Sequence, residues 1–122
     1  MDNVKLLSPS VLAFVGDAVY SLLVREYLAG KHSADSLHNA AVEYVSAAAQ
    51  ARAFALIKPY LTEEETAIFN RGRNFHTNNT PKSSSHADYH TATGLEALFG
   101  FLHLSGQTER IKELFKIITE NR

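Results

Sequence analysis

Apolar positions along the chain recur at helical spacing, and no segment shows the sustained alternation that a half-buried β-strand requires. The longest apolar run follows Ser8 and Pro9, a good N-cap and first-turn pair, and continues through Leu28. Gly30 then provides a plausible stop. Because this segment is apolar on nearly every side, we expect a central, buried helix.

Four further helices are predicted from the same pattern. The first is rich in alanine, the second opens on the capping-box pair Thr62 and Glu65, and the last two begin at Asp88 and Thr108. Their expected bounds are residues 37–57, 62–70, 88–104 and 108–120, with Gly106 between the last two. The pattern therefore predicts an all-α fold. A chain of 122 residues suits one hydrophobic core, so residues 1–122 are expected to form a single domain.

A long loop, Arg71 to Ala87, is expected between the third and fourth of these five helices, because the segment is dense in Asn, Ser, Thr and Gly. Loops of this length are usually functional or disordered. No acidic residue occurs between residues 67 and 87, whereas Arg71, Arg73 and Lys82 do. A locally basic loop on a chain of net charge −1 can meet a phosphate backbone, although a plain solvated loop is the alternative.

The composition of the chain indicates the cellular compartment in which we expect the protein. The chain has no cysteine, which excludes disulfides and thiolate metal sites and agrees with a reducing cytoplasm. The first ten residues lack the basic start and apolar run of a signal peptide. No apolar stretch approaches the roughly 20 residues that span a bilayer. We therefore expect a cytoplasmic protein without a membrane segment.

Two lone carboxylates stand inside apolar helices: Asp17 in LAFVGDAVY and Glu96 in TGLEALFG. An ionised carboxylate in a dry core costs several kcal/mol unless it is paired, hydrogen-bonded or bound to a cation. Gly16 and Gly94 stand close to these acids, and a glycine inside a helix is typical of a place where another backbone, a ligand or a metal comes near. If the two helices pack together, both carboxylates face one cleft.

Two readings of these acids are open at this point. Two carboxylates in one cleft repel unless a cation lies between them, and an oxygen-only site suits Mg²⁺, for which Mn²⁺ can substitute. The alternative is structural, with Asp17 paired to Arg25 or Arg52 or capping a helix end.

At these residues the chain resembles a known family. LAFVGDAVY resembles the signature helix of the ribonuclease III catalytic domain, and TGLEALFG resembles its second acid-bearing helix. NRGRN and the later TPKS resemble the short branch, Mini-ribonuclease III, which lacks a double-stranded-RNA-binding domain. The resemblance covers nearly the whole chain. It implies a homodimeric, Mg²⁺-dependent endoribonuclease that cleaves double-stranded RNA and matures the precursor of large-subunit (23S) ribosomal RNA.

The resemblance also implies roles for single residues. Asp17 and Glu96 become the catalytic, metal-binding acids. With the resemblance added, Arg71, Arg73 and Lys82 are the expected RNA contacts. The possible lining of the cleft is Tyr20, Tyr89 and Thr93. A large-subunit ribosomal protein is a further candidate partner.

The chain departs from the larger enzymes of the family at two positions. They carry an acid four residues before the first carboxylate and three before the second, where this chain has Ala13 and Thr93. Waters, Thr93 or RNA phosphate oxygens would complete the coordination, and we expect weaker metal binding and slower turnover. The alternative functions are a non-catalytic duplex-RNA-binding ribosome-assembly factor and a helical dimerisation domain.

His86 and His90 stand four residues apart, a spacing that can place both on one helical face. A zinc site there would need two further ligands, and the sequence has no HExxH motif. A position at the loop end or facing the duplex is the preferred interpretation of this pair.

Overall fold

The computed structural model describes residues 3–75 and 85–122. Six α-helices and two short 3₁₀ helices follow one another, and no strand occurs in these two ranges. The elements are η1 (Val4–Leu6), α1 (Pro9–Ala29), α2 (Ala34–Val45), α3 (Ala47–Ile57), η2 (Lys58–Tyr60), α4 (Glu63–Arg73), α5 (His86–Leu104) and α6 (Thr108–Glu120). The all-α prediction is confirmed. None of the described helices is both long and apolar enough to span a lipid bilayer.

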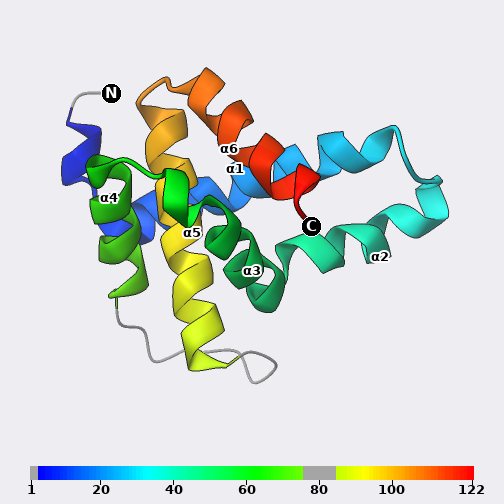
Figure 1. Ribbon diagram of the computed structural model, residues 1–122, viewed down its shortest axis with the longest axis horizontal. Helices are drawn as coiled ribbons and strands as arrows, with labels where there is room; N and C mark the ends of the chain where they lie inside the picture. Colours follow the sequence, from blue (N-terminus) through cyan, green and yellow to red (C-terminus); the bar gives the residue numbers. More distant parts are fainter. Residues whose placement is uncertain (1–2, 76–84) are drawn as a thin grey trace.

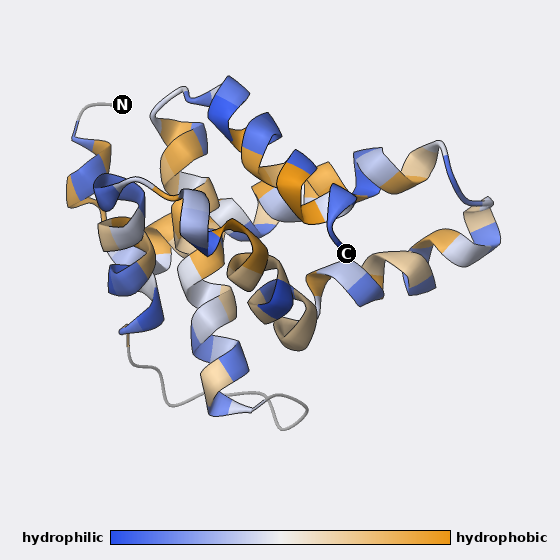
Figure 2. Cartoon of the chain, viewed as in Figure 1, coloured by the Kyte–Doolittle hydropathy of each residue, from blue (hydrophilic) through white to orange (hydrophobic). Residues whose placement is uncertain are grey.

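Helix α5 is the centre of the molecule. Figure 1 shows it between α4 on one side and α3 on the other, and α1 and α6 also pack against it. Nine of its residues are buried, including an unbroken run from Ala97 to Leu102. Figure 2 shows the hydrophobic colour concentrated on the C-terminal half of this helix. A helix that is apolar all round belongs in a core, and the C-terminal half of α5 meets that condition.

The prediction of a central, buried first helix holds for one face of α1 only. Ser8 caps α1 as expected, because its side chain accepts a hydrogen bond from the Val11 backbone N–H. One face packs into the core through residues spaced four apart: Leu12, Gly16, Tyr20, Val24 and Leu28. The opposite face leaves Phe14 81% exposed and Leu22 58% exposed. Part of the apolar surface of α1 is therefore not covered by the other described elements of the chain.

The crossing of α1 and α5 brings two backbones into contact. A Cβ atom added at Gly16 would lie 1.6 Å from the carbonyl oxygen of Glu96, and one at Gly100 would lie 1.9 Å from that of Leu12. Only glycine permits this approach, as expected for Gly16. A second close contact joins α4 and α5, where a Cβ at Gly94 would meet the ring and the carbonyl of Phe69. The close neighbour of Gly94 is therefore helix α4.

The single alanine-rich helix predicted over residues 37–57 is in fact two helices. The break is at Ser46, whose ψ of 156° is extended and ends α2. The Ser46 hydroxyl then accepts a hydrogen bond from the Ala49 N–H and caps α3. The break turns the chain, so α2 runs beside the C-terminal end of α1 as an arm that extends from the rest of the molecule (Figure 1).

The capping box at Thr62 and Glu65 opens α4 as predicted. Glu65 also accepts hydrogen bonds at 2.8 Å from Arg110, which ties α4 to α6. Burial opposes ionisation of Glu65, but the hydrogen bonds from Arg110 and Thr62 and the positive charge of Arg110 together outweigh it and lower the pKa of the carboxyl. Helix α4 ends at Arg73, three residues later than expected.

The expected loop from residue 71 to residue 87 is shorter at both ends. Helix α5 begins at His86 and is capped by the Ser85 hydroxyl, which accepts from the Asp88 N–H; Asp88 is therefore not the cap. Residues 76–84, which include Lys82, lie outside the described part of the chain. The N-cap of α6 is Gln107 rather than Thr108, and the left-handed Gly106 (φ 76°) makes the turn before it.

Candidate active site

Asp17 of α1 and Glu96 of α5 face one open pocket beside the helix crossing. The close contact between Gly16 and the Glu96 backbone places them there, because Asp17 directly follows Gly16 and Glu96 itself takes part in the contact. The pocket has a volume of about 250 Å³. This is smaller than the cavities that enclose drug-sized ligands, so it suits an ion and a phosphate group. Its lining is Ser10, Ala13, Phe14, Asp17, Phe75, Tyr89, Thr93 and Glu96.

The two acids differ in their surroundings. Glu96 is half-buried, whereas Asp17 is exposed. Burial, the negative charge of Asp17 and a hydrogen bond between the two carboxyls raise the pKa of Glu96 to about 8, against the smaller opposing effect of the Gln50 amide. Ionisation of both carboxyls in the pocket is therefore unfavourable unless a positive charge binds between them.

The structural reading of Asp17 and Glu96 has no counterpart among the described residues. None of the ion pairs found there includes either acid, so Asp17 is not paired with Arg25 or Arg52, the partners that this alternative offered. The two carboxylates are paired with each other across the helix crossing. This arrangement is the one that a divalent cation would stabilise.

The positions of the two absent acids line the same pocket. Ala13 lies one turn before Asp17 and Thr93 lies three residues before Glu96, and both contribute to the wall. The Thr93 hydroxyl donates to the Tyr89 carbonyl at 3.0 Å, so its oxygen can still accept or ligate. No cluster of three or more His, Asp or Glu side chains able to hold a metal occurs in the described ranges. The pocket offers two carboxylates, an oxygen-only donor set that fits Mg²⁺ with water in its remaining positions.

Two of the three predicted RNA contacts, Arg71 and Arg73, are described, and their surroundings differ. Arg71 donates to the backbone carbonyls of Lys5 at 2.6 Å and Leu7 at 2.9 Å, so it anchors the N-terminal segment, a use that competes with a phosphate contact. Arg73 is exposed at the end of α4 and lines a groove with Phe54 and Lys58. Lys82 lies outside the described residues.

Of the predicted cleft residues, Thr93 and Tyr89 line the pocket and Tyr20 does not. Tyr20 is 1% exposed, and its ring packs edge-on against Phe99 and Phe115 at 5.3 Å and 5.8 Å between centroids. Burial raises the pKa of its phenol above the ordinary value. The correction follows from helical geometry, because Tyr20 shares the core-facing stripe of α1 with Gly16 and Val24.

Gln50 was not predicted from the sequence as a site residue. This side chain is 3% exposed, and its Nε2 donates to Glu96 Oε2 at 3.3 Å and to the Val45 carbonyl at 3.0 Å. A signal was available, since Gln50 is spaced three and seven residues from the buried Ala53 and Ile57. A polar residue on the buried face of an otherwise apolar helix needs a partner.

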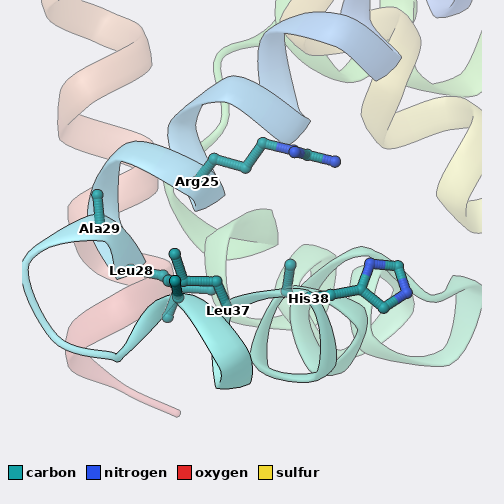
Figure 3. A pocket seen from close by; sticks show the side chains of 7 residues that line it. Arg25, Leu28, Ala29, Leu37 and His38 are labelled. Carbon is teal, nitrogen blue, oxygen red and sulfur yellow. The ribbon is translucent and has the colours of Figure 1, made fainter.

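A second groove lies between α1 and α2, about 12 Å along α1 from Asp17, given the helical rise. Figure 3 shows Arg25 of α1 and His38 of α2 extending to the same side, with Leu28, Ala29 and Leu37 at its base. Its lining contains no carboxylate. The groove therefore lacks the donors that distinguish the Asp17–Glu96 pocket.

His86 and His90 stack with centroids 6.2 Å apart at the start of α5.

Sequence comparison points in the same direction as the pocket. Residues 10–107 match the model of the ribonuclease III domain. A Thermoanaerobacter protein named Mini-ribonuclease 3 is 45% identical over 118 residues, which cover 95% of this chain and 83% of the relative. A Brevibacillus brevis protein of the same name is 47% identical over 111 residues, covering 89% of this chain and 83% of the relative.

A solved structure is also similar along its whole length. The crystal structure of a protein from Fusobacterium nucleatum matches with a TM-score of 0.86 at 30% sequence identity, covering 98% of both chains. The match includes every element that forms the pocket.

Proposed function

The chain belongs to the ribonuclease III family, within the Mini-ribonuclease III group, and from this premise we propose that it hydrolyses double-stranded RNA with Mg²⁺ held by Asp17 and Glu96. One observation carries the proposal. The glycine crossing of α1 and α5 brings the two carboxylates, 79 positions apart in the chain, into one open pocket.

The residues of the pocket have different roles in the proposed reaction. Asp17, on the exposed side, and Glu96, on the buried side, provide the negative charge that binds the ion, and Glu96 must be ionised to do so. Bound Mg²⁺ would supply an activated water and neutralise charge on the scissile phosphate. Thr93 offers a hydroxyl oxygen at the position of an absent acid. Phe14 and Phe75 add apolar rings to the wall of the pocket.

Duplex RNA is recognised mainly through its backbone and shape, so the contacts that matter are basic side chains near the pocket. Arg73 is the strongest described candidate, since it is the exposed last residue of α4 and stands two residues before Phe75, which lines the pocket. Lys82 keeps its proposed role from the sequence. Arg71 is the weakest of the three, because its guanidinium already binds two backbone carbonyls.

The proposed enzyme is a homodimer. Val11, Phe14 and Leu22 form an exposed apolar face on α1, and α1 also carries Asp17. Exposed apolar surface of this kind is typical of an interaction site. A partner of the same sequence covering this face would place the two pockets near the shared interface, as cleavage of both strands of a duplex requires.

The natural substrate we propose is the precursor of 23S ribosomal RNA in the cytoplasm, and a large-subunit ribosomal protein is a candidate partner. Support for the substrate comes from the close similarity to proteins named Mini-ribonuclease 3 along almost the whole chain.

A cleavage assay tests the activity. The protein is incubated with a radiolabelled precursor-rRNA duplex and with the matching single strand, in Mg²⁺ and then in excess chelator. Cutting of the duplex alone, and only with the ion, is expected. The second candidate is a binding protein without activity, favoured because the described residues supply the pocket with no carboxylates beyond Asp17 and Glu96. Retention of the duplex without cleavage under all conditions would support that candidate and refute the nuclease.

A further inference from the structure

Gln50 is polar where packing alone would favour an apolar side chain. It lies on the core-facing side of α3 among Ala49, Ala53 and Ile57 and is 3% exposed. Its Oε1 is buried and accepts no hydrogen bond from any residue in the described ranges. An apolar side chain of similar size would fill the space without burying an unpaired oxygen. Something other than packing must account for the carboxamide.

The two hydrogen bonds that Gln50 donates explain its polarity. One goes to the carbonyl of Val45, the last residue of α2, at 3.0 Å. Carbonyls at the end of a helix lack an intrahelical partner, and the Ser46 break creates this one. The other bond goes to Glu96 Oε2 at 3.3 Å. The backbone bond fixes the carboxamide, and the fixed carboxamide then holds the carboxylate.

Glu96 needs such a restraint. Binding of a cation requires both acids to be ionised, and the carboxyl–carboxyl hydrogen bond is then replaced by repulsion between two like charges, which works against their facing one another across the pocket. Gln50 is the described side chain that donates a hydrogen bond to Glu96. Groups that hydrogen-bond a metal-binding carboxylate set its orientation, and their loss weakens metal binding or activity about 10- to 100-fold.

We propose that Gln50 is a positioning residue that holds the Glu96 carboxylate toward Asp17, so that the pair binds a divalent cation. This inference rests on the proposed function of the two acids. It makes the junction of α2 and α3 part of the active site, although neither helix contributes a side chain to the pocket wall.

The test replaces the carboxamide without changing the size of the side chain much. In Q50L, and in the more flexible Q50M, both donated hydrogen bonds are lost. Mn²⁺ affinity, followed by the EPR signal of free Mn²⁺, is expected to fall about 10- to 100-fold. The Mg²⁺ concentration for half-maximal cleavage of duplex RNA is expected to rise by a similar factor, with much of the rate recovered at high Mg²⁺.

The control is I57V, a buried substitution on the same helix two turns from Gln50. It removes a methyl group from the core without touching Glu96. It is expected to lower Tm while leaving Mn²⁺ affinity and the Mg²⁺ dependence at wild-type values. A loss of Mn²⁺ affinity in I57V equal to that in the Gln50 variants would show a general effect of stability and overturn the inference.

Two further outcomes separate this inference from the function on which it rests. Wild-type Mn²⁺ affinity and Mg²⁺ dependence in folded Q50L or Q50M, with E96Q inactive, would refute the role of Gln50 alone. If Q50L does not fold, Q50M decides, because methionine adapts to the shape of its site. Wild-type cleavage by E96Q would instead refute the proposed function, and the inference with it.

Discussion

At the scale of single residues, the pairing of Asp17 with Glu96 was predictable because each acid interrupts an apolar helix and each has a glycine nearby. The unequal burial of the two acids could not be predicted from the sequence. Which side of α1 faces the core depends on its neighbours, and a helix with apolar residues on both sides gives no answer in its own sequence. For the same reason Tyr20 was placed in the cleft, whereas it packs against Phe99.

The raised pKa of Glu96 gives a stability that depends on pH. In the metal-free folded protein this pKa is about 8, against an ordinary 4.5. Between these values the folded state keeps a proton that the unfolded state releases, so stability falls as pH rises from about 5 to 8. Glutamine has no such proton. We therefore expect E96Q to be more stable than the wild type at pH 8 by a few kcal/mol, or about 10 °C in Tm.

Thermal unfolding in chelator at pH 5 and pH 8 checks this prediction. The matched control is E109Q, since Glu109 has a side chain that is 90% exposed and lies far along the chain on α6. Its Tm is expected to follow the wild type at both pH values. Equal Tm changes between pH 5 and pH 8 in wild type and E96Q would contradict the buried, charge-coupled position of Glu96.

At the scale of elements, the starts of helices with a strong cap were predictable and the break inside the alanine-rich segment was not. Ser8 and Thr62 precede their helices with clear capping chemistry. Ser46 also caps a helix, but no glycine or proline marks the end of α2 before it, and the alanines on either side have high helix propensity. After the break α2 packs against α1, a tertiary contact that the local sequence does not reveal.

The α1–α5 crossing gives the second prediction. In G16A the new methyl group would lie 1.6 Å from the Glu96 carbonyl oxygen. The atoms that it meets belong to the backbone of α5, which cannot shift without displacing the whole helix. We expect a loss of at least about 3 kcal/mol in the free energy of unfolding, together with weaker metal binding, because the helices must separate. Urea denaturation measures the first effect.

G30A is the control for this substitution. Gly30 also belongs to α1, at its C-cap, but nothing lies within 4 Å of its added Cβ and its φ is −90°. Alanine there is expected to change stability by less than about 1 kcal/mol, in the stabilising direction. A G16A protein as stable as G30A would mean that the two helices do not cross in backbone contact.

At the scale of the whole molecule, the all-α domain and its family could be predicted, because helical periodicity and the two acid-bearing motifs extend over most of the chain. The free apolar side of α1 could not, since the sequence alone does not distinguish an intramolecular core from an interface between copies. That side gives the third prediction. L22D places a charge at a 58% exposed apolar position away from the pocket and is expected to yield folded monomers.

Light scattering after size-exclusion chromatography measures the mass of L22D. V42D is the matched control, because Val42 is also an exposed apolar residue, at 46%, but lies on α2. V42D is expected to remain dimeric. Dimeric L22D, or V42D that dissociates equally, would place the interface elsewhere.

The most direct test of the central claim is the single-turnover rate of duplex-RNA cleavage by E96Q at saturating Mg²⁺, with circular dichroism and molecular mass shown to match the wild type. If the Asp17–Glu96 pair holds the ion that activates water, the rate falls by about a thousandfold or more, since several kcal/mol of transition-state stabilisation are lost. A rate within tenfold of the wild type would contradict the account.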